Sequence, residues 1–471
     1  MEFFEINPEY AERPMLIDDM GNRVKYGDFA DFYIQSEKKL EPGTLMFLFC
    51  ENSIGSVFFY LTCLNKKIVP LLLDRNMDET LAEQLVKTYE PEYIAKPENM
   101  GDTAGYGTEP VLKGYGYRIY ERLHKNGKKL HEDLALLLTT SGSTGSPKLV
   151  RQSRKNISSN ARAIAKYLEL DRTERPITSL PMNYTFGLSI INSHLEAGAA
   201  VLLTGRSLFE KEFWQFFSEE KATSISGVPY TFEMLKRLGF LEMGLPSLRT
   251  MTQAGGKLPV HLHREFAEYA ERTGKRFIVM YGQTEATARM GYLPPEYAIS
   301  KCGSMGIAIP GGKFRLMEDE HTEIKEPDMV GELVYEGDNV TMGYAVCRED
   351  LEKGDERNGI LFTGDMAKRD LDGFYYITGR KKRFLKLYGK RVNMDEIEQM
   401  FKGQYDGIGV ACTGEDDHMR IYLEGKDDEF CRKAEEWITS KTGLHPGGVR
   451  VLPICEIPKN ESGKTIYKNL S

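Results

Sequence analysis

Short apolar runs alternate along the chain with amphipathic stretches of helical period. The apolar runs have the length of buried strands and fall at Leu45–Cys50, Ile68–Leu73, Leu134–Thr140, Ala200–Thr204, Arg276–Tyr281 and Gly331–Tyr335. Helical patterns lie between them, at Glu79–Tyr89, Asn156–Leu170, Lys211–Glu219, Pro229–Leu238 and Pro259–Arg272. Alternation of this kind predicts an α/β fold in which helices cover sheets of parallel strands.

The pattern changes near Gly379. The stretch Arg380–Met394 carries seven Lys or Arg residues, and no acidic residue occurs before Asp395. Predicted helices follow at Met394–Lys402 and Asp427–Lys441, and predicted strands follow near Gly407–Cys412, Met419–Leu423 and Val449–Leu452. This is enough for a small α+β domain, so we predict an N-terminal domain over residues 1–379 and a C-terminal domain over residues 380–471.

Length and charge narrow the class of protein. A chain of 471 residues suggests two to four structural units. The net charge of -8 gives no reason to expect nucleic acid or an anionic membrane as partner, so an anionic ligand would need positive charge gathered locally. The most apolar stretch, Ser56–Leu73, is broken by Asn65–Lys67 and by Pro70. It predicts a buried helix followed by a strand rather than a membrane span.

The cysteines indicate a reducing compartment. All seven are scattered along the chain, and no two have the CxxC spacing. This pattern favours reduced thiols in a cytoplasmic protein over a disulfide framework or a zinc site. The opening sequence MEFFEINPEY is acidic and lacks the basic and apolar segments of a signal peptide.

The strongest local motif is TTSGSTGSPK at Thr139–Lys148, directly after the apolar run Leu134–Leu138. Small residues let backbone N–H groups approach a polyphosphate closely, and Lys148 adds positive charge. The alternative is a flexible Gly/Ser loop. The motif is not a Walker A loop, and Pro458–Thr465 also departs from that pattern because Pro458 replaces its first glycine.

Two weaker motifs follow strand-like runs. In Tyr281–Thr287, a hydroxyl beside a carboxylate suits a phosphate oxygen and a magnesium ion, although a helix start capped by Thr284 is the alternative. In Leu361–Asp365, an aspartate after a strand suits the two hydroxyls of a ribose, and a simple turn residue is the alternative.

These motifs, taken in order with Gly379-Arg380 and Gly463-Lys464, resemble the core motifs of the adenylate-forming superfamily. That superfamily contains acyl-CoA synthetases, peptide-synthetase adenylation domains and beetle luciferases. The stretch TSGSTGSPK is highly specific to it, and the resemblance runs from about Thr139 to Leu470. It implies the adenylate-forming enzyme fold, with a large multi-layer N-terminal domain of β-sheets and helices and a small, mobile α+β C-terminal domain.

The resemblance assigns a nucleotide site. The loop that closes over the β- and γ-phosphates of ATP would comprise Thr140, Ser141, Gly142, Ser143, Thr144, Gly145 and Lys148. Gly255 and Gly256 would lie along the adenine, Tyr281 would flank it, and Gly282 would belong to the same cofactor-binding site.

Further roles in the same site fall on single residues. Thr284 would contact the α-phosphate, Glu285 would hold Mg²⁺, and Asp365 would bind the ribose with help from Arg380. Lys464 would be the adenylation lysine, because a fixed ammonium neutralises the charge that builds up when a carboxylate attacks a phosphate.

The resemblance also implies domain movement between two half-reactions, with the hinge at Lys382. After the movement, Lys386–Gly389 would line the tunnel for a pantetheine arm. Tyr388 is bulkier than the small residue often found there.

The acid site is expected at Pro181–Ser189, which resembles the family's pocket motif. Tyr184 takes the position that gates carboxylate entry, and Phe186 either contacts the acid or is a core aromatic. Peptide-synthetase domains for α-amino acids usually have Asp where Gly187 stands, to pair with the ammonium group. Its absence favours a plain carboxylic acid.

The predicted function is ATP-dependent activation of a small carboxylic acid to an acyl-adenylate, with release of pyrophosphate. The acyl group would then pass to CoA or to the phosphopantetheine of an acyl carrier protein. Two alternatives remain: an adenylation domain for an amino or aryl acid that acts without CoA, and a non-catalytic ATP-binding protein.

Overall fold

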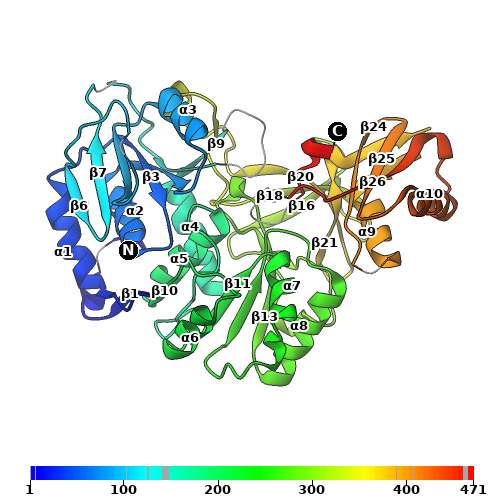
Figure 1. The fold of residues 1–471 in the computed structure, drawn as a ribbon, viewed down its shortest axis with the longest axis horizontal. Coiled ribbons are helices and arrows are strands. Elements are labelled where there is room, and N and C mark those ends of the chain that lie inside the picture. The colour runs from blue at the N-terminus through cyan, green and yellow to red at the C-terminus, as the bar shows by residue number, and fades with distance from the viewer. Residues whose placement is uncertain are drawn as a thin grey trace. The chain divides into compact units, whose positions relative to one another are not determined.

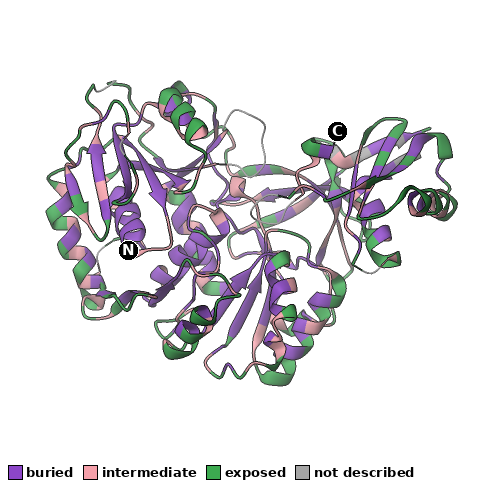
Figure 2. Ribbon diagram, viewed as in Figure 1, coloured by how far each residue is buried: buried purple, intermediate pink, exposed green. Residues whose placement is uncertain are grey.

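The computed structural model describes residues 2–5, 7–101, 103–124, 127–139, 148–388, 390–405, 407–459 and 465–470. The chain divides into two compact units. The first comprises Met1–Lys313 and Tyr335–Leu361, and the second comprises Phe314–Val334 and Phe362–Ser471. Each unit has its own sheets and its own buried interior (Figures 1 and 2).

The first unit contains an eight-stranded sheet of order β19-β9-β8-β4-β3-β5-β7-β6. Its strands are β3 (Leu45–Cys50), β4 (Val69–Asp74), β5 (Tyr93–Pro97), β6 (Leu112–Gly114), β7 (Tyr117–Glu121), β8 (Leu134–Thr139), β9 (Leu149–Ser153) and β19 (Gly343–Ala345). Strand β3 pairs in parallel with β4 and β5, and β4 pairs in parallel with β8. The strands β3 and β4 are apolar almost throughout because both faces of this part of the sheet are covered.

The same unit contains a five-stranded sheet of order β11-β12-β13-β14-β15. Its strands are β11 (Ser224–Gly227), β12 (Thr250–Gln253), β13 (Arg276–Tyr281), β14 (Gly291–Tyr292) and β15 (Ile307–Ala308). The first three are parallel, and their register places Gly227, Gln253 and Val279 side by side. A three-stranded sheet consists of β1 (Pro14–Asp18), β2 (Arg23–Lys25) and β10 (Val201–Leu203).

Helices of the first unit are α1 (Tyr26–Glu37), α2 (Ile54–Lys66), α3 (Glu79–Tyr89), α4 (Arg154–Tyr167), α5 (Thr185–Glu196), α6 (Lys211–Glu219), α7 (Pro229–Arg237) and α8 (Val260–Thr273). Helix α2 is buried on nearly all sides, which explains its continuous apolar sequence. Helices α4 and α5 pack against each other and bury polar as well as apolar residues.

The second unit contains three sheets. The largest has the order β17-β16-β18-β20-β21, with β16 (Lys313–Met317), β17 (Glu323–Ile324), β18 (Val330–Glu336), β20 (Ile360–Arg369) and β21 (Tyr375–Arg380). The others are the hairpin of β22 (Phe384–Leu387) and β23 (Lys390–Asn393), and a sheet of β24 (Val410–Glu415), β25 (His418–Glu424) and β26 (Val449–Ile454). Helices α9 (Met394–Gln404) and α10 (Asp428–Thr442) pack on these last strands.

The structure confirms the α/β architecture and the expected elements. Strands β3 and β13 and helices α3 and α6 have the predicted bounds. The expectation of parallel strands holds for the centre of the eight-stranded sheet, which antiparallel strands flank on both sides. It also holds for β11, β12 and β13, which form one side of the five-stranded sheet of the first unit, while β14 and β15 on the other side are antiparallel. The boundary between residues 379 and 380 stays a prediction; β21 runs up to it and pairs with β20.

Two local alternatives from the sequence are wrong. Thr284 does not cap a helix: it begins the short 3-10 helix η3 (Thr284–Ala286), and the residue before it, Gln283, makes no capping hydrogen bond. Asp365 does not follow a strand and is not a turn residue. It lies inside the ten-residue strand β20, because the chain continues in register with β21 beyond Gly364.

The described residues also bear on the cysteines and on membrane insertion. All seven cysteines are described, and all are unpaired thiols. Across the described ranges, no helix has both the length and the apolar character needed to cross a bilayer.

A buried ion pair joins distant parts of the first unit. The Arg348 Nη2 atom lies 2.9 Å from Glu92 Oε1, and the two side chains are 1% and 8% exposed. The other Glu92 oxygen accepts the backbone N–H of Leu45 over 2.7 Å. The pair therefore fixes the segment after β19 against the start of β3.

We predict that Glu92→Ala lowers the free energy of unfolding by about 3 to 5 kcal/mol, because it leaves a buried guanidinium without its counter-ion. Lys155→Ala is the control, since its partner Asp338 is exposed, and the expected loss is under about 1 kcal/mol. Urea denaturation followed by circular dichroism measures both. Equal losses would show that the Arg348–Glu92 pair does not stabilise this unit.

Candidate functional site

The carboxyl ends of three parallel strands define one edge of the first unit. Strand β11 ends at Gly227, β12 ends at Gln253 and β13 ends at Tyr281, and their register aligns these ends. In parallel sheets, ligands bind beyond this edge. The predicted adenine residues Gly255 and Gly256 follow β12, and the motif Tyr281–Glu285 follows β13, so the sheet brings them together.

Tyr184 reaches the same edge from another segment. Gly255 has a φ of +83°, and a Cβ added to it would lie 2.8 Å from the Tyr184 hydroxyl and 3.0 Å from Val228. The Ser179 hydroxyl donates to the Ser226 carbonyl of β11, which holds the segment before Tyr184 against the sheet. Burial raises the pKa of Tyr184. The predicted gate residue therefore contacts the predicted adenine turn through a neutral hydroxyl.

Gly187 lies where helix α5 begins and is buried. A Cβ at this position would lie 2.2 Å from the Pro181 carbonyl oxygen. An aspartate cannot occupy this position without moving the backbone, so the structure gives a physical reason for the glycine. Phe186, the neighbouring residue, is buried at 3% exposure, and its ring centroid lies 6.4 Å from that of Tyr184.

The turn after β13 is strained and tightly held. A Cβ on Gly282 would lie 1.5 Å from the Ala288 carbonyl oxygen, and Ala288 itself has a φ of 106°. The Asn339 side-chain amide donates to the carbonyls of Ala286 and Arg289, over 2.8 and 2.9 Å. Unfavourable backbone conformations persist where surrounding contacts enforce them, and they are concentrated at functional sites.

Glu285 contacts a tyrosine that the sequence did not single out. The Tyr344 hydroxyl of β19 donates to Glu285 Oε1 over 2.7 Å. The Lys148 ammonium lies 3.3 Å from the centre of the Tyr344 ring, and the Arg357 guanidinium lies 4.6 Å from it. Through this ring, the structure brings the end of the predicted phosphate loop close to the predicted metal ligand.

The charge of Glu285 is not neutralised by a cation within the described part of the chain. Arg357 donates to the Glu285 backbone carbonyl, over 3.1 Å, and not to its carboxylate. Burial, together with Glu285, raises the pKa of Tyr344 to about 12, so the phenol remains a neutral donor. A carboxylate that is oriented by one hydroxyl and has no paired cation among the described residues fits the hard-cation preference of Mg²⁺.

Asp365 and Arg380 lie together in the second unit. They are partners in the register of β20 and β21, and Arg380 Nε lies 3.2 Å from Asp365 Oδ1. Asp365 is 4% exposed, whereas Arg380 is exposed. The Asp365 backbone N–H donates to the Thr363 hydroxyl, which donates to the Leu333 carbonyl.

Several predicted residues lie outside the described residues: Thr140, Ser141, Gly142, Ser143, Thr144, Gly145 and Lys464. Their described neighbours are paired across each gap, Thr139 with Leu149 and Lys459 with Thr465. Lys382 belongs to the 3-10 helix η6 (Lys381–Arg383), and its side chain is likewise not described.

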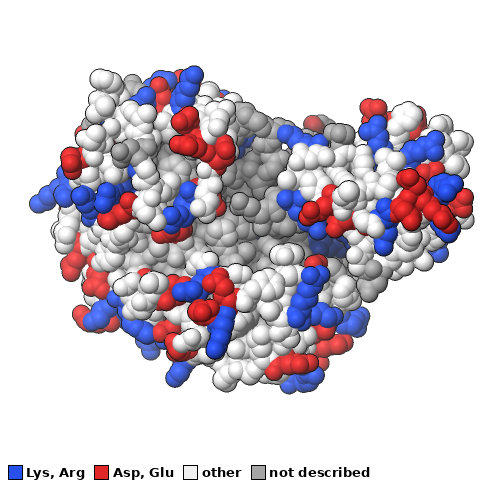
Figure 3. All heavy atoms as spheres, viewed as in Figure 1, with Lys and Arg blue, Asp and Glu red and all other residues white. Residues whose placement is uncertain are grey.

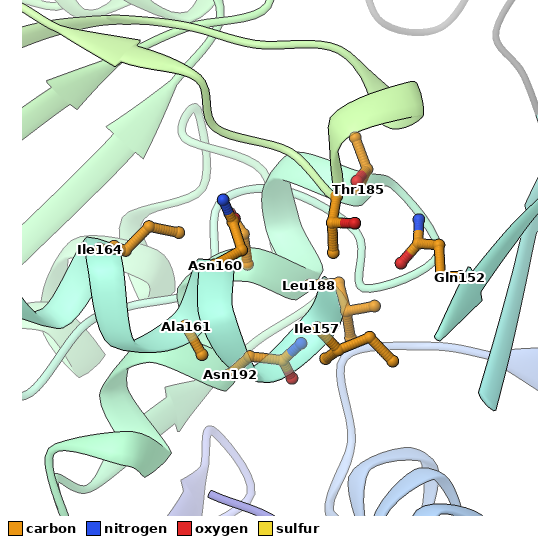
Figure 4. A pocket seen from close by; sticks show the side chains of 10 residues that line it. Gln152, Ile157, Asn160, Ala161, Ile164, Thr185, Leu188 and Asn192 are labelled. Atoms are coloured by element: carbon orange, nitrogen blue, oxygen red, sulfur yellow. The ribbon is translucent and has the colours of Figure 1, made fainter. Parts of the chain in front are cut away.

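A polar cavity lies between α4, α5 and the end of β9 (Figure 4). Its lining includes Thr185 and Thr287, which adjoin the two motif segments. Gln152 Nε2 and Asn160 Oδ1 also line it, and neither atom has a hydrogen-bond partner within the described residues. Buried polar atoms of this kind are satisfied by water or by a polar ligand.

Charges on the surface are mixed. On the face seen in Figure 3, Lys and Arg alternate with Asp and Glu over the described residues. That face has no extended positive patch of the kind that binds nucleic acid.

Sequence reasoning missed three residues: Tyr344, Arg357 and Arg289. Tyr344 and Arg357 carry no local signal, because their contacts are with residues far away in the sequence. The sequence does carry a local signal for Arg289, which is the only charged residue between Glu285 and Glu296.

Comparison with known proteins identifies the family to which the chain belongs. The family model of the AMP-binding enzymes matches residues 8–345, more than half of the chain. The chain belongs to the AMP-binding enzyme family, which confirms the resemblance seen in its motifs.

Its relatives include acid–CoA ligases. Oxalate–CoA ligase of Arabidopsis thaliana is 32% identical over 287 residues, which cover 59% of this chain and 54% of that protein. Indoleacetate–CoA ligase of Aromatoleum aromaticum is 31% identical over 283 residues, with coverage of 59% and 54%. These matches span about half the length of the relatives.

Solved structures show the same fold over nearly the whole chain. The o-succinylbenzoate CoA synthetase (MenE) from Bacillus subtilis, in complex with the acyl-adenylate intermediate OSB-AMP, has a TM-score of 0.77 at 20% identity and covers 98% of this chain and 95% of its own. ATP-bound MatB from Rhodopseudomonas palustris has a TM-score of 0.77 at 20% identity, with coverage of 99% and 97%. The fold is therefore the adenylate-forming α/β fold.

We predict that Gly282→Ala weakens ATP binding by at least about tenfold, or about 1.4 kcal/mol, because the new Cβ displaces the turn that carries Glu285. Gly244→Ala is the control: its surroundings within 4 Å are open, and it has no positive φ. Isothermal titration calorimetry measures both affinities. If Gly282→Ala binds ATP as the control does, this turn is not part of the nucleotide site.

Proposed function

We propose that this protein activates a carboxylic acid with ATP and then transfers the acyl group to a thiol. In the first step, a carboxylate oxygen attacks the α-phosphorus, the bond to the bridging oxygen breaks, and pyrophosphate leaves. In the second step, the thiol of CoA or of a carrier protein's phosphopantetheine displaces AMP to give a thioester. Both steps balance without an oxidant or a reductant.

One observation carries the proposal: Tyr184, the Gly255 turn and the Glu285 turn lie together at the carboxyl edge of β11, β12 and β13. Membership of the AMP-binding enzyme family supports it. The proposed acid residue Tyr184 and the proposed nucleotide residues Gly255 and Glu285 are thus neighbours in the first unit, as the first step requires.

The proposed nucleotide roles follow the chemistry of the side chains. Glu285 would hold Mg²⁺, which neutralises the charge of the departing pyrophosphate when it is bound. The loop Thr140–Lys148 and Thr284 would donate hydrogen bonds to phosphate oxygens. Asp365 would accept both hydroxyls of the ribose, and Arg380 would orient it.

The acid is not assigned by similarity. The relatives are named for oxalate, indoleacetate, 2-succinylbenzoate and long-chain fatty acids, which share little beyond a carboxyl group. The crowding at Gly187 supports an acid without an α-ammonium group, since no acidic side chain fits there to pair with it.

ATP–pyrophosphate exchange across a panel of acids tests the first step. Exchange with at least one carboxylic acid supports the proposal, and adding CoA or a holo carrier protein then identifies the acceptor. Exchange without thioester formation on either acceptor would favour an adenylation domain that acts without CoA. ATP binding without exchange on any acid would favour a non-catalytic ATP-binding protein.

We predict that Asp365→Ala weakens the binding of ATP and of a non-hydrolysable acyl-AMP analogue by about 10- to 100-fold, because the ribose loses a charged acceptor. Asp328→Ala is the control, since Asp328 is exposed and pairs only with Lys368 among the described residues. Calorimetry measures the affinities. Unchanged affinity for the analogue would contradict the ribose assignment.

We predict that Lys464→Ala slows adenylation by about 100-fold or more but largely spares transfer from a supplied acyl-adenylate, because its ammonium serves the step in which two anions meet. Lys382→Pro should do the reverse, since proline restricts the backbone rotation expected at the hinge. Single-turnover measurements separate the two steps. If both variants slow both steps equally, the domain-alternation proposal is wrong.

A further inference from the structure

Three arginines are almost completely buried within the described residues: Arg151, Arg289 and Arg348. Arg151 pairs with Glu356, and Arg348 pairs with Glu92. Arg289 is 2% exposed and has no carboxylate partner among the described residues. A buried charge without a counter-ion is costly, and proteins retain such groups where function requires them.

The contacts of Arg289 are with neutral groups. Its Nη2 atom donates to the Ser189 hydroxyl over 3.1 Å, and its Nη1 atom contacts the Tyr167 hydroxyl, at 3.5 Å, and the Met280 sulfur. Its Nε atom is buried without a hydrogen-bond partner in the described part of the chain. The guanidinium is therefore positioned by these contacts, but its charge remains uncompensated.

Arg289 also lines a second, small cavity between α4, α5 and the strands β11 and β12, with room for about one water molecule. The wall is rich in hydroxyl groups, from Ser193, Ser224, Ser226, Thr250 and Thr252. One carboxylate, that of Glu174, also belongs to the wall. It is already occupied, since it accepts from the Thr223 hydroxyl and lies 3.4 Å from Arg249 Nη1.

His194 contributes an acceptor to this wall. Burial, together with the charge of Arg289, lowers the pKa of His194 to about 4, so the ring is neutral near pH 7. The Nδ1 atom lies 2.8 Å from the Ile190 carbonyl and must donate to it, which leaves Nε2 as an acceptor. Nε2 has no partner within the described residues, so it suits a hydroxyl group or water.

The guanidinium lies next to the proposed acid site. Its central carbon is 4.1 Å from the centre of the Phe186 ring, whose own neighbour is Tyr184. Its backbone is held by the Asn160 and Asn339 amides, over 2.8 and 2.9 Å. Only one aromatic ring therefore separates a fixed, uncompensated cation from the proposed carboxylate gate.

We propose that Arg289 is the counter-ion for a second carboxylate, so that the preferred substrate is a short dicarboxylic acid. This inference rests on the proposed function. One carboxylate would react, and the other would pair with the guanidinium through Nε and Nη2, an arrangement that planar arginine favours. The acid would be short, because only the Phe186 ring separates Arg289 from Tyr184, the residue that would gate the reacting carboxylate.

Wild-type exchange kinetics with matched ligands test this directly. Malonate, succinate and glutarate are each compared with their monomethyl esters, which keep the chain and lose one charge. We expect at least one diacid to exceed its ester in kcat/KM by about 30-fold or more, the range expected for a buried charge pair. If monoesters or plain monocarboxylic acids are activated as well as the diacids, the inference is wrong but the proposed function stands. If no acid of any kind supports exchange, the proposed function itself fails.

A variant tests the residue. Arg289→Met should reduce the diacid-to-ester ratio of kcat/KM by about 30-fold or more, mainly through KM, because the second carboxylate is then buried without a counter-ion. Arg289→Lys keeps a charge and should restore part of the ratio. Arg264→Met is the control, since Arg264 is exposed on α8.

Thermal unfolding and ATP affinity report whether Arg289→Met folds. An equal loss for diacid and ester in a folded variant would show a merely structural role and overturn the proposal. If Arg289→Met does not fold, the wild-type ratio and that of Arg289→Lys decide: a ratio near one in the wild type, or an unchanged ratio in Arg289→Lys, contradicts it.

Discussion

The parallel pairing of β11, β12 and β13 is the constraint on which the rest of the site depends. Because β11, β12 and β13 are parallel and in this register, their carboxyl ends lie at the same edge of the sheet. The loops that follow these strands are therefore neighbours, although a helix and a strand separate each loop from the next in the sequence. The loops beyond that edge are then shaped by close contacts rather than by sequence propensity. Gly255 and Gly282 both stand where a Cβ would collide with an atom already in place.

Those contacts also explain why the turn after β13 tolerates strain. Residues 282–289 are tied by side-chain amides from α4 and from the segment before β19. An amide that donates to two backbone carbonyls replaces hydrogen bonds that a helix or strand would otherwise supply. This network stabilises the strained backbone of Ala288, and it also fixes the segment that carries Glu285 and Arg289.

Much of the fold and part of the site could be predicted from the sequence. Strand β13 and helix α3 were bounded correctly because their apolar periodicity is uninterrupted. The strand position of Asp365 was not foreseen, because Gly364 before it reads as a turn although the chain continues in register with β21. Tyr344 was missed for a different reason: its role depends on a contact with Glu285, 59 residues earlier in the chain. Such pairings follow from sheet order, which local patterns do not encode.

The distribution of positive charge bears on how one site can handle two kinds of anion. Lys148 and Arg357 lie against the ring of Tyr344, half-buried, where a π face moderates their charge without neutralising it. Arg289 lies against the ring of Phe186 and is almost wholly excluded from solvent. A charge in the first setting is partly screened and can exchange partners, whereas a charge in the second interacts strongly and selectively because water does not compete. In a protein of net charge -8, this division suits the two proposed ligands, a polyphosphate near Tyr344 and a small carboxylate near Arg289.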